Sequence, residues 1–408
     1  MDLHFTPEDI AFRERVRQWL GENTPQTELK TLEERRAWIR KLYDAGFVGM
    51  GWPKEYGGQN ARPMEQAIVA DEMARVNAPP AAIGLGVGIV GPTIAHHGTP
   101  EQKERFLKKI MTHEEIWCQL FSEPNAGSDL AALKTRAENK GDHWEINGQK
   151  VWTSSGYIAD WGLLIARTDP TVAKHLGISM FLINMRQPGV EVRRLKQITG
   201  GSEFCEVFFT KARVEPDMLV GKLNQGWQYT QTTFGFERGA GTLNRVTAHM
   251  MSLRRLVEYC RRLKKNGHTA IEDPLVRQKL GRAYVEIEVM RYSGLRVLSL
   301  LEKGSRPGPE SSVSKLYYSE FSKRYHEWIM EILGPYGILT DGIPAEFADV
   351  SSGSGRGSNY AVDFLASRSG TIAAGTSQVQ RNIIGERVLG LPNEVRTDRI
   401  EIAKQKGQ

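Results

Sequence analysis

Residues 121–129 read Phe-Ser-Glu-Pro-Asn-Ala-Gly-Ser-Asp, and Trp-Thr-Ser follows at 152–154. Gly127 lets a ligand approach the backbone closely because it has no Cβ, and Ser128 adds a hydroxyl donor. Trp152 offers a flat apolar wall for a planar ring, with two hydroxyl side chains directly after it. A lone tryptophan more often packs in a core. The two segments together are compatible with a site for a planar ligand, although serines in a loop more often cap turns.

The spacing of apolar residues along the chain changes twice, once before and once after these segments. Short β-rich runs, separated by Gly, Asn, Asp and Pro, occupy 116–209 and have the spacing of an all-β domain. Helical signals lie on both sides, because Thr6 is a candidate N-cap before Pro7, and the apolar spacing of 276–301 predicts one helix about 38 Å long. We therefore expect an α+β chain with an N-terminal helical domain (1–117), a middle β domain (118–222) and a C-terminal helical bundle (223–408).

One turn is expected inside the β domain. Asn147-Gly148 stands between two apolar runs of the segment 142–153. This dipeptide is the strongest short-range signal for a hairpin, so we expect the chain to reverse its direction there.

The composition excludes several classes of protein. The chain has 408 residues, of which 40% are hydrophobic and 25% charged, so it has room for two or three domains and lacks the signature of disorder. Three widely separated cysteines indicate neither a disulfide framework nor a metal site. No signal peptide and no apolar run of about 18 residues is found, so we expect a cytoplasmic protein without membrane insertion. The net charge of +6 suits a phosphorylated small molecule and does not require nucleic acid.

The segments at 121–129 and 152–154 closely resemble the two flavin-contacting segments of the acyl-CoA dehydrogenase family. Residues 52–58 (WPKEYGG) resemble its N-terminal loop, and 375–384 (GTSQVQRNII) resemble its C-terminal flavin-contact segment. The resemblance implies a β-barrel-like middle domain, a four-helix bundle and FAD held between domains. A Rossmann fold is not expected, because no G-x-G-x-x-G follows a strand. The cofactor-binding residues that the resemblance implies are Gln119, Phe121, Ser122, Gly127, Ser128, Trp152, Thr153, Ser154, Gln278, Thr376 and Gln378.

The resemblance also implies where the catalytic base lies. Many members carry it as the Glu of a Tyr-Glu-Gly-Thr element, and that position is Ala374 in this chain. Another group, resembling isovaleryl- and long-chain enzymes, places it on a helix of the C-terminal bundle just before an arginine, and Glu237-Arg238 match that pair. A carboxylate must reach the α-proton as a hydride leaves the β-carbon for flavin N5. Glu237 is the expected base, and its alternative role is a solvated helix residue that pairs with a neighbouring arginine.

The thioester oxygen needs hydrogen-bond donors as its negative charge develops. In the family these are a flavin ribityl hydroxyl and the backbone N–H at the position of Ala374, so the substitution removes the base and keeps the donor. The resemblance implies substrate contacts at Ser128, Arg238, Ala374 and Gly375. The small side chain at this position favours branched, bulky or long acyl groups, and it does not separate steroid, dicarboxylyl, aromatic and fatty chains.

Two segments depart from the family pattern. Lys265 stands within 262–268, where members carry an arginine for the neighbouring subunit's flavin, and 331–337 (EILGPYG) replaces a Gln-x-x-Gly-Gly-x-Gly element. These changes fit bacterial enzymes, resembling steroid and dicarboxylyl-CoA dehydrogenases, that assemble as mixed tetramers. A homodimer, a homotetramer and a heterotetramer with a related subunit all stay open.

The expected activity is FAD-dependent dehydrogenation of an acyl-CoA thioester to the trans-2-enoyl-CoA, with electrons passing to an electron-transferring flavoprotein. A flavin oxidase or monooxygenase on the same fold is an alternative. A DNA-binding homologue is another, because the basic pairs at 254–255, 261–262 and 264–265 lie at helical intervals, although these also suit a solvated face.

Overall fold

The N-terminal helix begins at the residue that its capping signals indicate. Helix α1 spans Pro7–Asn23, and the Asp9 N–H donates to the Thr6 hydroxyl while the Thr6 N–H donates to the Asp9 carboxylate. This reciprocal pair satisfies two of the N–H groups that a helix leaves open at its start. The start expected at Thr6 is therefore confirmed.

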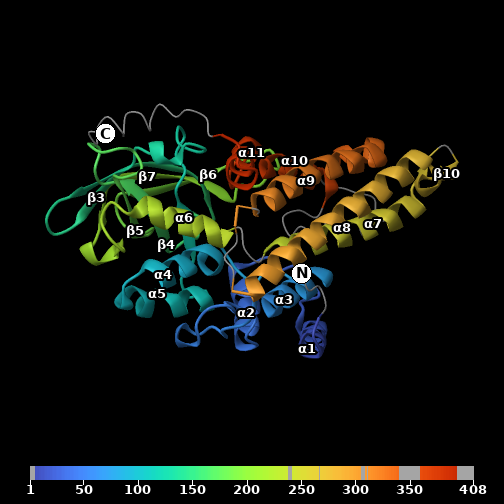
Figure 1. The fold of residues 1–408 in the computed structure, drawn as a ribbon, viewed down its shortest axis with the longest axis horizontal. Coiled ribbons are helices and arrows are strands. Elements are labelled where there is room, and N and C mark those ends of the chain that lie inside the picture. The colour runs from blue at the N-terminus through green and yellow to red at the C-terminus, as the bar shows by residue number, and fades with distance from the viewer. Residues whose placement is uncertain are drawn as a thin grey trace.

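The computed structural model describes residues 5–237, 241–265, 267–304, 308–309, 311–339 and 359–392, with only the backbone for 236, 237, 241–244 and 265. The N-terminal helices and an eight-stranded sheet form one body, and the C-terminal helices extend from it as a long bundle (Figure 1). The other helices are α2 (Leu32–Asp44), α3 (Pro63–Arg75), α4 (Gly91–His97), α5 (Pro100–Thr112), α6 (Gly226–Glu237), α7 (Gly241–Arg262), α8 (Pro274–Glu302), α9 (Ser311–Leu333), α10 (Tyr360–Gly370) and α11 (Ser377–Ile383). The strands are β1 (Trp117–Leu120), β2 (Arg136–Asn139), β3 (Trp144–Ser154), β4 (Trp161–Arg167), β5 (Ile178–Asn184), β6 (Val190–Leu195), β7 (Phe204–Val214), β8 (Leu219–Val220), β9 (Lys264–Lys265) and β10 (His268–Thr269).

The central strands β4 and β5 of the large sheet are buried on both faces. Its strands run in the order β6-β7-β3-β2-β4-β5-β8, and β1 pairs with β4 in parallel. Along β4, Leu163 and Ile165 belong to a core shared with the N-terminal helices, whereas Leu164 and Ala166 belong to a second core on the opposite face. Side chains of a strand alternate between faces, so one short segment contributes to two cores.

The turn expected at Asn147-Gly148 is wrong. Strand β3 continues through both residues, and the chain reverses instead near 140–143, where the Lys140 N–H donates to the His143 carbonyl at 2.8 Å. Gly148 has φ 149°, and a Cβ there would lie 2.6 Å from the Thr135 hydroxyl oxygen. The glycine therefore serves a bulge and a close approach of two segments, which are the other common reasons for glycine in a strand.

The bundle has its own core, built mainly by α7, α8, α9 and α10. Val276, Leu280, Ile287 and Met290 of α8 are buried in it, which confirms the long helix expected at 276–301. Tyr284, which shares their spacing, is 53% exposed and lies outside this core. Among the described residues, no helix is long and apolar enough to cross a membrane.

Candidate functional site

A buried ion pair fixes the loop after β1 to strand β3. The Lys150 ammonium donates to a Glu123 carboxylate oxygen at 2.9 Å and to the Phe121 carbonyl at 2.9 Å. The same carboxylate accepts hydrogen bonds from the backbone N–H groups of Lys134 and Thr135, at 2.7 and 2.9 Å. The Val151 N–H donates to the carbonyl of Ser122. These bonds bring the segment 121–128 alongside 150–154, as the cofactor prediction requires.

The two partners of this pair respond differently to burial. Burial lowers the pKa of Lys150 to about 8, although Glu123 opposes that shift. Burial alone would raise the pKa of Glu123, but the charge of Lys150 and the two backbone N–H donors outweigh it and leave the pKa below its usual value. The carboxylate is therefore ionised at neutral pH and holds the loop.

Trp152 is held in a conformation that tryptophan rarely adopts. Its φ is 60°, its side chain is 61% exposed, and it lies where the pairing of β3 with β7 shifts register between Lys150 and Thr153. A bulky residue at positive φ costs free energy, and such residues cluster at functional sites. The indole packs edge-on against Phe204, with 6.2 Å between centroids, and most of its surface stays accessible to a planar ring.

The hydroxyl groups near Trp152 do not all face the same way. Ser154 is partly exposed, whereas Thr153 is fully buried and its hydroxyl has no partner among the described residues. Ser128 and Gly127 are exposed, and a Cβ on Gly127 would meet no atom within 4 Å. The residues present therefore fit a flavin through an exposed ring, two accessible hydroxyls and an open backbone, while the side chain of Thr153 faces the interior.

Helix α6 joins this region to the expected base. The ring of Phe234 packs edge-on against Phe121, with 6.2 Å between centroids. One residue earlier, the Thr233 hydroxyl lies 3.1 Å from the hydroxyl of Thr93, and both threonines are fully buried. Glu237 is the last residue of α6, one turn beyond Phe234. Its side chain and the whole of Arg238 lie outside the described residues.

A tight turn between α10 and α11 forms the second half of the candidate site. Ala374 and Gly375 both have left-handed backbones, with φ 54° and 84°. The buried Gln380 donates to the Ala374 carbonyl at 2.9 Å, and the Lys315 ammonium donates to the Gly375 carbonyl at 2.7 Å. Within the described chain the Ala374 N–H donates to no acceptor, and the residue is exposed. The turn thus holds its carbonyls inward and leaves a donor facing outward, as expected for a contact to a thioester oxygen. Thr376 accepts the Val379 N–H and caps α11.

The remaining predicted residues lie apart from these two clusters. Gln119 is partly buried on β1, and Gln378 is exposed on α11. Gln278 is exposed on α8, and Lys265 is on the short strand β9. No contact among the described residues joins Gln278 to the loop at 121–128 or to Trp152, so a flavin contact by Gln278 stays a prediction.

Four positioning residues were missed by the sequence reasoning. Glu123 was quoted only as part of a motif, and Lys150, Lys315 and Gln380 were given no role. A lysine inside an apolar strand was the one available signal for Lys150, because a buried lysine needs a carboxylate partner. The partners of Lys315 and Gln380 are backbone carbonyls, which the sequence does not distinguish.

Comparisons with known proteins agree with this geometry. Family models for the N-terminal, middle and C-terminal domains of acyl-CoA dehydrogenases match residues 6–114, 118–212 and 224–389. The acyl-CoA dehydrogenase IpdE1 of Mycobacterium tuberculosis is 39% identical over 398 residues, which cover 94% of this chain and 98% of that protein.

Two solved structures have the same fold. The ChsE4-ChsE5 complex from Mycobacterium tuberculosis matches with a TM-score of 0.82 and 30% identity, over 97% of this chain and 100% of that chain. A protein described as Tcur3481-Tcur3483 steroid ACAD matches with a TM-score of 0.80 and 28% identity, over the same shares of both chains. With its three matched domains and these relatives, the chain belongs to the acyl-CoA dehydrogenase family of flavin-dependent oxidoreductases.

Proposed function

We propose that this chain uses FAD to convert an acyl-CoA thioester to the trans-2-enoyl-CoA, with Glu237 as the base. The observation that carries the proposal is the packing of Phe234 against Phe121, which joins the helix that ends at Glu237 to the loop of the expected flavin site. The Thr93–Thr233 contact fixes the same helix from its other side.

The residues that would hold the cofactor are those that the bulge and the loop expose. Trp152 would stack on the ring system, and the hydroxyls of Ser154 and Ser128 would donate hydrogen bonds to it. When bound, FAD supplies the acceptor for the hydride that leaves the β-carbon.

The chain itself handles the proton and the developing charge. The Glu237 carboxylate accepts the α-proton, which requires it to be ionised before the reaction. The free N–H of Ala374 donates to the thioester oxygen and stabilises its growing negative charge. Because residue 374 carries only a methyl group, no second carboxylate competes for that side of the substrate.

The space beside Ala374 leads us to propose a branched, bulky or long acyl group. One of the two solved relatives is described as a steroid enzyme, so a steroid-derived thioester belongs among the candidates. An electron-transferring flavoprotein is the proposed acceptor of the electrons.

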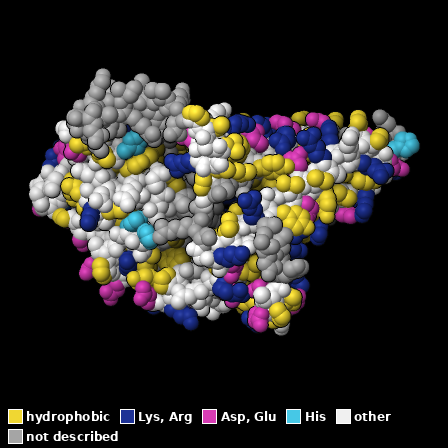
Figure 2. All heavy atoms as spheres, in the orientation of Figure 1, with side chains coloured by type: hydrophobic (Ala, Val, Ile, Leu, Met, Phe, Trp, Pro, Cys, Tyr) yellow, Lys and Arg dark blue, Asp and Glu magenta, His cyan; other side chains and the backbone are white. Residues whose placement is uncertain are grey.

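We also propose assembly with a related chain. Both solved relatives are described by pairs of named chains. Helix α8 presents Val285, Val289, Tyr292 and Leu300 at helical spacing, each between 44% and 59% exposed. Hydrophobic side chains accordingly interrupt the charged surface of the bundle along α8 (Figure 2). An exposed apolar strip on a long helix, here interrupted by the exposed Arg296, is typical of a protein–protein interface.

The test is an anaerobic titration of the purified yellow protein, alone and with candidate partner chains, against straight, branched and steroid-derived acyl-CoA thioesters. Bleaching near the flavin maximum by one class identifies both the reaction and the acyl group. Slow reoxidation in air would distinguish a dehydrogenase from an oxidase. No bleaching by any thioester in a flavin-replete complex would contradict the proposal.

Glu237→Gln tests the base. We expect this variant to retain its flavin and to lose at least 1,000-fold in the rate of bleaching, since the amide cannot accept the proton; this is about 4 kcal/mol of barrier. Glu33→Gln, on the exposed first turn of α2, is the matched control and should bleach at the wild-type rate. A Glu237→Gln variant with wild-type bleaching would exclude the assignment.

A further inference from the structure

A long groove separate from the candidate site lies between the N-terminal helices and the bundle. Its volume is about 940 Å³, and none of the predicted flavin or substrate residues lines it. Its walls come from α1, α3, α7 and α8. The described residues that line it include Met64, Ala67 and Ile68 of α3, Val246, Met250 and Leu253 of α7, and Leu280, Gly281 and Leu295 of α8.

The shape of the groove limits what fits into it. Its lining follows α7 from Val246 to Arg262, a length of about 24 Å at 1.5 Å per residue. This length accommodates one extended acyl chain that lies along α7.

The floor of the groove is apolar. Ile68, Val246 and Leu280 are buried in it, with 1%, 2% and 7% of their surface exposed. Met64 and Met250 are only partly buried. Methionine side chains are flexible and polarisable, so these two can adjust to a ligand of irregular shape.

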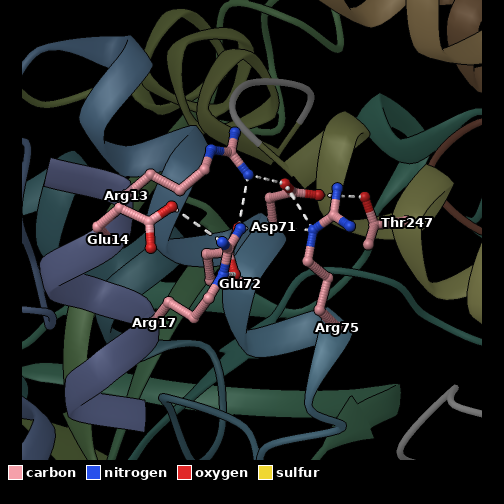
Figure 3. A network of polar contacts seen from close by, with 7 residues as sticks. All are labelled: Arg13, Glu14, Arg17, Asp71, Glu72, Arg75 and Thr247. Carbon is pink, nitrogen blue, oxygen red and sulfur yellow. Dashed lines mark hydrogen bonds and ion pairs between the residues drawn. The ribbon is translucent and has the colours of Figure 1, made fainter. Parts of the chain in front are cut away.

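One end of the groove is closed by a satisfied polar network. Asp71 of α3 accepts hydrogen bonds from Arg13 of α1 and from the Thr247 hydroxyl of α7, and it pairs with Arg75 at 3.2 Å (Figure 3). The adjacent Glu72 is 1% exposed and binds Arg13 as well. The charges at this end are therefore neutralised among themselves.

The rest of the groove carries positive charge without a partner. Apart from Arg13, Arg75 and Asp71, four arginines and two carboxylates line it, which gives a net charge of +2. Glu258 pairs with Arg261. In the part of the chain that the structure describes, Arg254, Arg255 and Arg262 form no ion pair, and the Nε and Nη2 atoms of Arg255 are enclosed without an acceptor. Enclosed donors without acceptors are unfavourable, so this region is suited to an anion.

We propose that the groove binds an anionic amphiphile, a fatty carboxylate whose chain lies along the apolar floor and whose head pairs with Arg255. Arg254 and Arg262 add to the positive field around the head. A fatty acyl-CoA has the same two features, because it carries an apolar acyl chain and its phosphates are negatively charged. The site is distinct from the proposed catalytic site and does not depend on its activity.

The test is calorimetric titration of the full flavin-containing chain with laurate below its micelle concentration. Dodecyltrimethylammonium, with the same chain and a cationic head, should bind at least tenfold more weakly. The visible flavin spectrum is recorded in parallel, because a ligand in the catalytic site perturbs it and a ligand in the groove does not. Competition by lauroyl-CoA shows whether the thioester is also accepted.

Two variants remove the site by different means. Gly281→Phe fills the groove from α8, where an added Cβ meets no atom within 4 Å, and Gly21→Phe is an equally open control on α1 outside the groove. Arg255→Gln removes the cation, with Arg40→Gln on the exposed face of α2 as its control. We expect each groove variant to weaken laurate binding at least tenfold and both controls to bind normally.

Four results would overturn the proposal. They are unchanged laurate binding by Gly281→Phe, equal binding of the cationic amphiphile, a flavin shift in step with the calorimetric isotherm, and a change in oligomer size caused by Gly281→Phe. The last would mean that another subunit covers the groove. If the flavin-containing wild-type protein binds laurate but dehydrogenates no acyl-CoA thioester, only the catalytic proposal is contradicted.

Discussion

Trp152 adopts a backbone conformation that is unfavourable for its large side chain. A large side chain at φ 60° with 61% exposure contributes little packing to the chain, so its conformation needs a reason outside stability. The proposed flavin supplies that reason. The buried Lys150–Glu123 pair provides the rigid base from which the bulge projects.

We expect Trp152→Ala to weaken flavin binding about tenfold, because a stacked aromatic pair contributes about 0.5–1.5 kcal/mol. The stability of the flavin-free chain should change by less than about 0.5 kcal/mol, since surface substitutions rarely do more. Flavin absorbance after dialysis and urea unfolding of the apoprotein measure the two effects. Trp152→Phe keeps a flat ring, and its flavin affinity should lie between those of the wild type and Trp152→Ala. An apoprotein of Trp152→Ala that unfolds much earlier would assign the indole a packing role instead.

Lys150→Met should be far more damaging to the fold. It leaves Glu123 ionised and buried with only its two backbone donors, and breaking a buried pair costs about 3–5 kcal/mol. The double variant Glu123→Gln/Lys150→Met, which removes both charges, should recover part of the loss. Denaturant midpoints of the three proteins decide this, and equal midpoints for wild type and Lys150→Met would show that the pair contributes nothing.

At the scale of elements, helix α9 and helix α11 together shape the turn that carries Ala374. Lys315 of α9 donates to the Gly370 carbonyl at 3.1 Å and to the Gly375 carbonyl at 2.7 Å, so one ammonium connects the end of α10 to the turn. The turn then presents its free N–H in a fixed direction.

Lys315→Met should therefore act on the chemical step. We expect kcat to fall roughly tenfold, about 1.4 kcal/mol of transition-state stabilisation, with little change in flavin content. Lys315→Arg, which keeps the donor, should recover part of the rate. Single-turnover bleaching and flavin absorbance separate the two quantities. A loss of flavin equal to the loss of rate would instead indicate general disorder of the bundle end.

The elements differ in how far the sequence could predict them. The start of α1 was predictable because Thr6 and Asp9 satisfy each other locally. The false turn at Asn147-Gly148 arose because a local signal cannot reveal that β3 pairs with β2 on one side and β7 on the other. The contact of Trp152 with a flavin ring stays a prediction, and the inward orientation of Thr153 depends on the bulge, which the sequence does not reveal.

At the scale of the whole molecule, Asp71 connects three helices that are far apart in the sequence. Arg13 of α1, Arg75 of α3 and Thr247 of α7 converge on it. Burial alone would raise the pKa of Asp71, but the hydrogen bonds of Thr247 and Arg13 and the charge of Arg75 outweigh it and lower the pKa below its usual value.

This shift predicts how the chain responds to acid. A carboxyl whose pKa is lower in the folded state stabilises the fold above its unfolded value, 3.8, and loses that contribution as pH falls through the folded value. Asp71→Asn should therefore cost about 2 kcal/mol at pH 7, in the range of hydrogen bonds to charged groups, and less at pH 3, where part of this contribution is lost. Unfolding curves at pH 7, 4 and 3 measure this. A cost that is constant with pH would show that the charge is irrelevant.

The order of the domains was predictable from the sequence, because the apolar spacing changes at each boundary. The boundaries at 117/118 and 222/223 stay predictions. The groove and the Asp71 network were not predictable, since they join residues of α1, α3 and α7 that are separated by up to 234 positions from Arg13 to Thr247. In the sequence, the residues of the exposed strip on α8 have the same helical spacing as core residues. Only the packing shows which side of the helix faces outward.

The exposure of Trp152 has an optical consequence. Four of the nine tryptophans are at most 8% exposed and four others, Trp19, Trp161, Trp227 and Trp328, are partly buried, whereas Trp152 is 61% exposed and emits from water. The red edge of the emission spectrum should come largely from Trp152 and should be removed by acrylamide before the rest. Energy transfer to a flavin stacked on the indole would quench this component first, which makes the native chain its own fluorescent sensor of cofactor loading.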